Sequence, residues 1–293
     1  MPQPSEACLL SQLQSGPERV ATVAGLIRGA TSPDVLDAAL AVMVETGDPE
    51  LREAVRERYR LLSADGPRHD SGCGMRRALT RALRGVADAS DQPILESAVW
   101  TYEFVRPGPR EVAGDLRGEA LLALADLDHA LAAFHAVRLL TDGHTSPMSG
   151  QPALTAARVL AATDAVLPLY EYIMRHAADS PEVAAECLRS LSGLPGSLLT
   201  SLFEELAGSD DETVLLGLFD LVLPHAERAR LRDSLATWLR ETRFHDIFRY
   251  VVAAVVAGRD PHLLPMLDDD IAGADCSKQD PVDEARRLLP GRY

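Results

Sequence analysis

The stretch from residue 130 to residue 140 is apolar on nearly every side, and this feature constrains the fold more than any other. Its periodicity predicts a helix, in which only His135 and Arg138 are strongly polar. A helix without a polar face has to be covered by neighbours on more than one side. Asp128 precedes it as a capping residue. Apolar helical patterns also lie on either side of it, so the sequence predicts a stack of helices.

Proline marks the starts of many helices along the chain. Five times a serine or aspartate precedes a proline, which places a capping side chain before the first helical residue. These pairs are Ser32-Pro33, Asp48-Pro49, Ser180-Pro181, Asp260-Pro261 and Asp280-Pro281. Three of them are followed by an acidic residue, which is favourable at the positive end of a helix dipole. The pattern predicts many short helices.

A second element recurs inside alternate predicted helices: a small or β-branched residue, then leucine, then an apolar residue three positions later. Its leucines are Leu40, Leu83, Leu121, Leu160, Leu188 and Leu218, and they follow one another at intervals of 28 to 43 residues. Thr163 interrupts the fourth copy. Two helices in a period of this length are typical of an α-solenoid. We therefore predict an all-α fold, a right-handed α–α superhelix of about seven helix pairs.

The predicted pairs are 17–29 with 33–46, 49–63 with 75–87, 93–106 with 115–127, 129–141 with 152–163, 166–178 with 181–192, 196–207 with 212–223, and 226–242 with 245–257. They form one repeat domain at 17–257, preceded by a loosely ordered N-terminus at 1–16. A C-terminal capping segment at 258–293 follows, with a short helix near 282–289 and the acidic residues Asp268, Asp269 and Asp270 covering the last repeat.

The segments 33–43, 115–127 and 181–191 resemble repeats of the HEAT/armadillo superfamily, and the resemblance extends over residues 17–257. It implies a fold whose concave face binds other macromolecules. A few members of that superfamily are enzymes or assist enzymes, among them HEAT-like alkylpurine DNA glycosylases and bilin lyase subunits. The resemblance is one of pattern and implies no particular activity for this chain.

Composition and charge narrow the classes of partner. Aromatic residues make up only 5% of the chain, which argues against a sheet, and the formal net charge is −15. Such a charge repels phosphate backbones and anionic lipids, so nucleic acid is an unlikely partner and a membrane is not expected. Residues 1–110 are the least acidic part, with 13 arginines against 15 acidic residues. Any anion-binding surface is therefore expected there.

No signal peptide is recognised, and the longest apolar run, 251–257, is too short to cross a bilayer. The four cysteines are scattered and form no zinc-binding pattern, so we expect free thiols in a cytoplasmic protein without a metal or other cofactor. The chain contains no P-loop, dinucleotide-binding, zinc-protease, nucleophile-elbow or EF-hand motif. We predict no catalytic residues and no enzymatic activity.

A row of arginines is the strongest local feature of the sequence. Arg76, Arg77, Arg81 and Arg84 lie on the predicted helix 75–87, which holds no acidic residue. One hypothesis is a patch that binds phosphate or an acidic partner. The alternative is a solvated face that pairs with the acidic surface of neighbouring repeats.

An aromatic pair is the second feature. Trp100 and Phe104 project from the predicted helix 93–106 on the side opposite its apolar face. Exposed aromatic residues are frequent anchors of protein–protein interfaces. The alternative is that the pair packs against the next helix of the stack.

Several polar residues have a plain interpretation. Asp220 is the only charge in an apolar helix, and we interpret it as part of a narrow solvent-facing stripe. His135 and Arg138 are interpreted as an interior pair with satisfied hydrogen bonds. The long loops at 65–74 and 142–150 are interpreted as surface loops, although the first contains His69, Asp70 and Cys73.

These observations favour a non-catalytic scaffold or adaptor that binds another protein through the concave or edge surface of the solenoid. The alternatives are a nucleic-acid-binding protein similar to the alkylpurine glycosylases, with its groove near residues 52–84 and Trp100, and an accessory subunit of a modifying enzyme, as in bilin lyases. No position matches the catalytic aspartate of the glycosylases.

Overall fold

The computed structural model describes residues 19–29, 31–108, 110–267 and 276–287. Helices account for 71% of these residues, and a single pair of two-residue strands is the only sheet among them, so the predicted all-α class is confirmed. In the described ranges, none of the helices combines the length and the apolar character that a bilayer crossing requires. The predictions for residues 1–16 and for Asp268, Asp269 and Asp270 fall outside the described residues.

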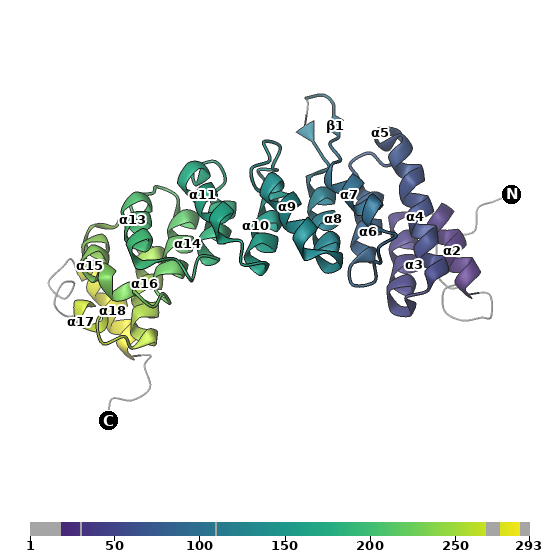
Figure 1. Ribbon diagram of the computed structural model, residues 1–293. Coiled ribbons are helices and arrows are strands. Elements are labelled where there is room, and N and C mark those ends of the chain that lie inside the picture. Colours follow the sequence, from purple (N-terminus) through teal and green to yellow (C-terminus); the bar gives the residue numbers. More distant parts are fainter. Residues whose placement is uncertain (1–18, 30, 109, 268–275, 288–293) are drawn as a thin grey trace. The chain divides into compact units, whose positions relative to one another are not determined.

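The chain divides into two compact units, residues 1–165 and 166–293 (Figure 1). The first unit contains α2 (Arg19–Gly29), α3 (Pro33–Thr46), α4 (Pro49–Ala64), α5 (Gly66–His69), α6 (Gly74–Leu83), α7 (Gln92–Val99), β1 (Phe104–Val105), β2 (Arg110–Glu111), α8 (Gly114–Leu127), α9 (His129–Leu140) and α10 (Ala153–Ala162). The second contains α11 (Val166–His176), α12 (Pro181–Arg189), α13 (Gly196–Leu206), α14 (Glu212–Val222), the 3-10 helix η1 (Arg228–Leu231), α15 (Arg232–Glu241), α16 (His245–Gly258), α17 (Leu264–Met266) and α18 (Cys276–Arg287).

The helices of the first unit pack in two series. In one series α3, α6, α8 and α10 contact one another in that order, and in the other α4 lies between α2 and α7. Within the unit, the predicted pairs α2 with α3, α4 with α6, α7 with α8 and α9 with α10 are all in contact. Leucines and alanines of α8 and α10, such as Leu121, Leu124 and Leu160, are fully buried. The core therefore extends along the series of helices.

The second unit repeats this arrangement with its own core. Helices α12, α14, α16 and α18 contact one another in order, while α11 packs on α12 and α13 packs on α14. Gly217 of α14 lies against Ala185 of α12, where an added Cβ would stand 2.5 Å from the Ala185 Cα. The side chain of Lys278, the only lysine of the chain, donates to Leu239 O at 2.9 Å near the end of α15. Lys278 thereby joins α18 to α15.

The helix starts follow the proline pattern in three of five places. Helices α3, α4 and α12 begin at Pro33, Pro49 and Pro181. The carboxylate of Asp48 accepts the Glu50 N–H at 2.8 Å, and Asp128 likewise caps α9 by accepting the Leu131 N–H at 3.0 Å. Capping of this kind satisfies backbone donors that have no partner inside the helix.

Two of the predicted starts are wrong. Asp260 accepts backbone N–H groups of a turn that precedes α17, so no helix begins at its proline. Pro281 lies inside α18, which already begins at Cys276. The predicted tail helix near 282–289 therefore exists but starts six residues earlier.

Candidate functional site

The segment after α7 forms a hairpin instead of continuing as a helix. Helix α7 ends at Val99, so the predicted helix 93–106 is wrong beyond that residue. Strands β1 and β2 then pair antiparallel, with Phe104 opposite Glu111 and Val105 opposite Arg110. The turn between them has the sequence RPGP, and its prolines cannot continue a helical hydrogen-bond pattern. Figure 1 shows this hairpin projecting beyond α7 and α8 of the same unit.

A buried arginine holds the base of the hairpin. The side chain of Arg117 on α8 is 0% exposed, and it donates to both carboxylate oxygens of Glu111 at 2.9 and 3.1 Å and to Thr101 O at 2.9 Å. Its Nε lies 3.3 Å from the carboxylate of Asp142 in the loop before α10. A guanidinium inside a core is stable only when such acceptors replace water. Arg117 therefore links the hairpin, α8 and this loop.

A second buried arginine holds the other arm of the hairpin. Arg76 is 1% exposed and donates to both oxygens of Glu103 at 2.6 and 2.9 Å and to Asp70 Oδ2 at 3.1 Å. Burial opposes the charge on Arg76, but these carboxylates raise its pKa. Asp70 comes from the long loop that precedes α6, so each of the two long loops supplies an aspartate to a buried arginine. Arg76 is thus unavailable at the surface, in contrast to its expected place in the arginine row.

Trp100 is exposed and yet fixed in position. Its side chain is 57% exposed, and the guanidinium carbon of Arg138 lies 3.8 Å from the centre of its ring. Arg138 also donates to Val99 O and to the hydroxyl of Tyr102, each at 2.8 Å. Stacking on a guanidinium and a hydrogen-bonded support restrict the rotamers of the indole. The pair His135–Arg138 is therefore not an interior pair, since Arg138 supports an exposed aromatic residue.

Phe104 lies on β1, is 47% exposed, and meets the ring of His144 edge-on at 5.3 Å. The ring of His144 also contacts Tyr102, whose hydroxyl donates to Asp142 at 2.9 Å. Burial and this bond to a carboxylate raise the pKa of Tyr102. We call Trp100, Tyr102, Phe104 and His144 the aromatic ledge. Trp100 and Phe104 are linked indirectly, since Arg138 contacts both Trp100 and Tyr102, and His144 contacts both Tyr102 and Phe104.

The remaining arginines of the predicted row are neutralised by acids of α8. Arg77 pairs with Asp115 at 3.0 Å, Arg81 with Glu119 at 2.7 Å, and Arg84 approaches Asp126 at 3.7 Å. Hydrogen bonds to Glu119 raise the pKa of Arg81 against the effect of burial. This is the arrangement of the alternative interpretation, a solvated face that pairs with the neighbouring repeat. None of the contacts among the described residues joins these three arginines to Trp100.

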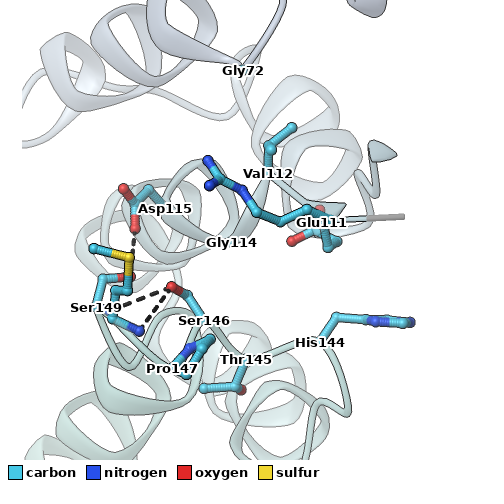
Figure 2. A pocket seen from close by; sticks show the side chains of 12 residues that line it. Gly72, Glu111, Val112, Gly114, Asp115, His144, Thr145, Ser146, Pro147 and Ser149 are labelled. Atoms are coloured by element: carbon cyan, nitrogen blue, oxygen red, sulfur yellow. Dashed lines mark hydrogen bonds between the residues drawn. The ribbon is translucent and has the colours of Figure 1, made fainter. Parts of the chain in front are cut away.

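A groove lies beside the hairpin, with a volume of about 490 Å³. It is lined by β2 and the residue after it, by the first turn of α8, and by the loop at 144–149. Figure 2 shows Asp115, Ser149 and Ser146 gathered toward one end of the groove, with Glu111 and His144 toward the other. The loop at 142–150 thus shapes a surface, and its sequence alone did not indicate this role.

The other polar residues that the sequence singled out have structural partners. Asp220 is partly exposed and accepts from Arg189 at 2.7 Å and from the hydroxyl of Tyr250, whereas Gly217 on the same side of α14 is buried. Burial raises the pKa of the Cys73 thiol to about 12, so it is a poor nucleophile at neutral pH. His69 contacts Leu61 O at 3.2 Å instead of the thiol.

Sequence reasoning missed Glu103, Glu111, Arg117 and Asp142, although these residues determine the shape of the site. One signal was present: Arg117 occupies a position of the apolar stripe that continues with Leu121 and Leu124. A charge on a core stripe predicts a buried partner but does not identify it.

The described residues contain no cluster of three or more histidine, cysteine or acidic side chains that could hold a metal ion. A comparison with protein-family models and a comparison with curated protein sequences each find no match to this chain.

Proposed function

We propose that the chain is a non-catalytic scaffold of the HEAT type, which binds a partner protein through the aromatic ledge of its first unit. The observation that carries this proposal is an exposed indole, Trp100, held by Arg138 beside a hairpin that two buried arginines fix in place. Pre-positioned aromatic side chains lose little entropy on binding and are the commonest anchors of interfaces.

The solenoid part of the proposal is supported by contacts that recur at the repeat spacing. Side chains on α6 and α8, α12 and α14, α14 and α16, and α16 and α18 meet at sequence separations of 30 to 38 residues. This spacing matches a repeat of two helices. A right-handed superhelix of about seven such pairs is the arrangement that we propose for the whole chain.

A protein partner is favoured over nucleic acid. The arginine row that would form a phosphate-binding groove is paired with Asp115, Glu119 and Asp126, and the chain carries a net charge of −15. Binding of duplex DNA needs arginines and lysines that are free to replace counterions. We also propose a cytoplasmic location, in keeping with the buried, unpaired thiols of Cys73 and Cys187.

The experiment is affinity capture from an extract of the cell that produces the protein, with quantification by mass spectrometry. The wild type is compared with the double variant Trp100→Ala, Phe104→Ala and with Leu198→Ala, a control on an exposed leucine of the second unit. At least one protein is expected to be retained by the wild type and the control and reduced about tenfold or more by the double variant.

Two results would overturn the proposal. One is that no captured protein depends on Trp100 and Phe104. The other is tight binding of duplex DNA in a fluorescence titration, with an affinity that falls steeply with salt.

A further inference from the structure

We infer that the groove beside the hairpin binds an extended acidic segment of the partner protein, with a carboxylate of that segment on the guanidinium of Arg110. This inference rests on the proposed function and assigns the chemistry of the partner. It follows from the charges that remain available in the groove after the internal ion pairs are formed.

The acidic residues that line the groove are already neutralised. Glu111 is held by Arg117 and accepts the Ala113 N–H at 2.8 Å. Asp115 pairs with Arg77 at 3.0 Å and accepts the Ser149 hydroxyl at 3.1 Å, a bond drawn in Figure 2. Each of these carboxylates is therefore compensated by an arginine of the chain itself.

Arg110, the arginine that lines the groove, has no such internal partner among the described residues. Arg110 on β2 lines the groove, is exposed, and its guanidinium forms no hydrogen bond or ion pair with any described residue. Arg106 at the turn of the same hairpin is also exposed and without such a partner among the residues that the structure covers. The hairpin therefore presents a positive surface in a chain whose net charge is −15. A carboxylate is the complementary group, because a guanidinium binds it with two parallel hydrogen bonds.

Two further features favour a peptide segment as the occupant. The Ser146 hydroxyl oxygen accepts weak contacts from the Met148 and Ser149 N–H groups at 3.4 and 3.3 Å, which leaves its hydrogen available as a donor among the described residues. Met148 on the rim is 93% exposed, and Phe104 lies on the strand paired with β2. In a segment that alternates acidic and apolar side chains, a carboxylate can bind the guanidinium of Arg110, while the apolar side chains cover Met148 and Phe104. Nucleic acid is disfavoured, since two unpaired arginines are few for a phosphate backbone.

The test is fluorescence anisotropy with the full chain and a fluorescein-labelled decapeptide of alternating glutamate and leucine. The control probe has glutamine in place of every glutamate. The variants are Arg110→Gln and, as a matched control, Arg68→Gln, an arginine in the same unit that is 83% exposed and paired with Asp65.

The glutamate peptide is expected to bind the wild type about tenfold or more tightly than the glutamine peptide, in line with the strength of charge-assisted hydrogen bonds. Arg110→Gln removes this difference, whereas Arg68→Gln changes the affinity less than twofold. Equal binding of the two peptides, absence of binding, or wild-type affinity in Arg110→Gln would overturn the inference. Competition by oligothymidylate but not by the unlabelled glutamate peptide would instead assign the groove to nucleic acid.

The capture experiment separates this inference from the proposed function. If Arg110→Gln retains the partner while Trp100→Ala, Phe104→Ala loses it, only the assignment of an acidic segment fails. If the double aromatic variant also retains the partner, the aromatic ledge is not the binding surface and the proposed function fails.

Discussion

Arg117 replaces its hydration shell with oxygens of three different segments, and its position on α8 is possible only because of them. Glu111, Thr101 and Asp142 surround the guanidinium, and the two carboxylates are themselves almost fully buried. The guanidinium and the two carboxylates offset one another's desolvation. Removal of the arginine therefore leaves two buried carboxylates without their cation in a medium of low dielectric constant.

Arg117→Met is expected to lower the free energy of unfolding of the first unit by about 3–5 kcal/mol. Urea denaturation can be followed by the fluorescence of Trp100 in a Trp238→Phe background, so that the signal comes from the first unit alone. Arg84→Met is the control, because Arg84 is 44% exposed and 3.7 Å from its acid. It should change stability by less than about 0.5 kcal/mol. Equal effects of the two substitutions would show that the buried pair does not stabilise the unit.

At the scale of single residues, the sequence predicts which side chains lie on a buried or an exposed face but does not identify their contact partners. Exposure of Trp100 and Phe104 was one of two open alternatives, and both side chains are exposed, although Phe104 lies on β1 and not on the expected helix. Helical periodicity places Arg76 on the buried stripe with Leu79 and Leu83, whereas Arg77 lies on the other face. The pattern does not identify the partners of Arg76, because Asp70 and Glu103 are 6 and 27 residues away.

At the scale of elements, most helices could be predicted because an apolar stripe is followed by a polar turn, and because some begin at a proline or at a capping aspartate, as α4 and α9 do. The hairpin could not, because α7 carries a helical pattern that runs into β1, and two-residue strands have no periodicity of their own. The RPGP turn was the available signal, and it lies after the aromatic residues that continue the helical pattern.

A substitution at Gly217 tests how closely α12 packs on α14. An added methyl group would stand 2.5 Å from the Cα and 2.8 Å from the Cβ of Ala185, so the two helices would have to separate. Gly217→Ala is expected to lower the free energy of unfolding of the second unit by about 1–3 kcal/mol. Gly25→Ala in α2 is the matched control, because no atom lies within 4 Å of its added methyl group. That substitution should raise stability by about 0.5–1 kcal/mol, since alanine favours the helix. Urea denaturation followed by circular dichroism measures whether each substitution raises or lowers the free energy of unfolding. An increase for Gly217→Ala would contradict the observed contact.

At the scale of the whole molecule, several groups with raised pKa values link folding to alkaline pH. Burial raises the pKa of Cys73 and Cys187 from 9.0 to about 12, and that of Tyr172 from 10.0 to about 12. Between these values the unfolded chain has lost protons that the folded chain retains. The free energy of unfolding should therefore be unaffected by these groups below pH 9 and fall as the pH rises from 9 toward 12.

The midpoint of urea denaturation, measured from pH 7 to pH 11, is expected to decrease above pH 9. Cys187→Ala combined with Tyr172→Phe should flatten this decrease in the second unit and leave it unchanged in the first. A midpoint that stays constant between pH 9 and pH 11 would show that these groups titrate at their ordinary values in the folded protein.

Each of the two units has its own core, and this determines how far a local change can spread. Contacts between neighbouring helices stabilise each unit, so a defect weakens its own surroundings most. Gly217→Ala is therefore expected to raise amide hydrogen exchange in α12 and α14, whereas protection of α6 and α8 stays at its wild-type level. Arg117→Met should show the reverse pattern, with faster exchange around α8 and an unchanged second unit. Mass spectrometry of peptides from both variants measures this directly. A uniform rise in exchange across both units would mean that the chain unfolds as one cooperative body, and it would remove the physical basis for describing the molecule as a series of helix pairs.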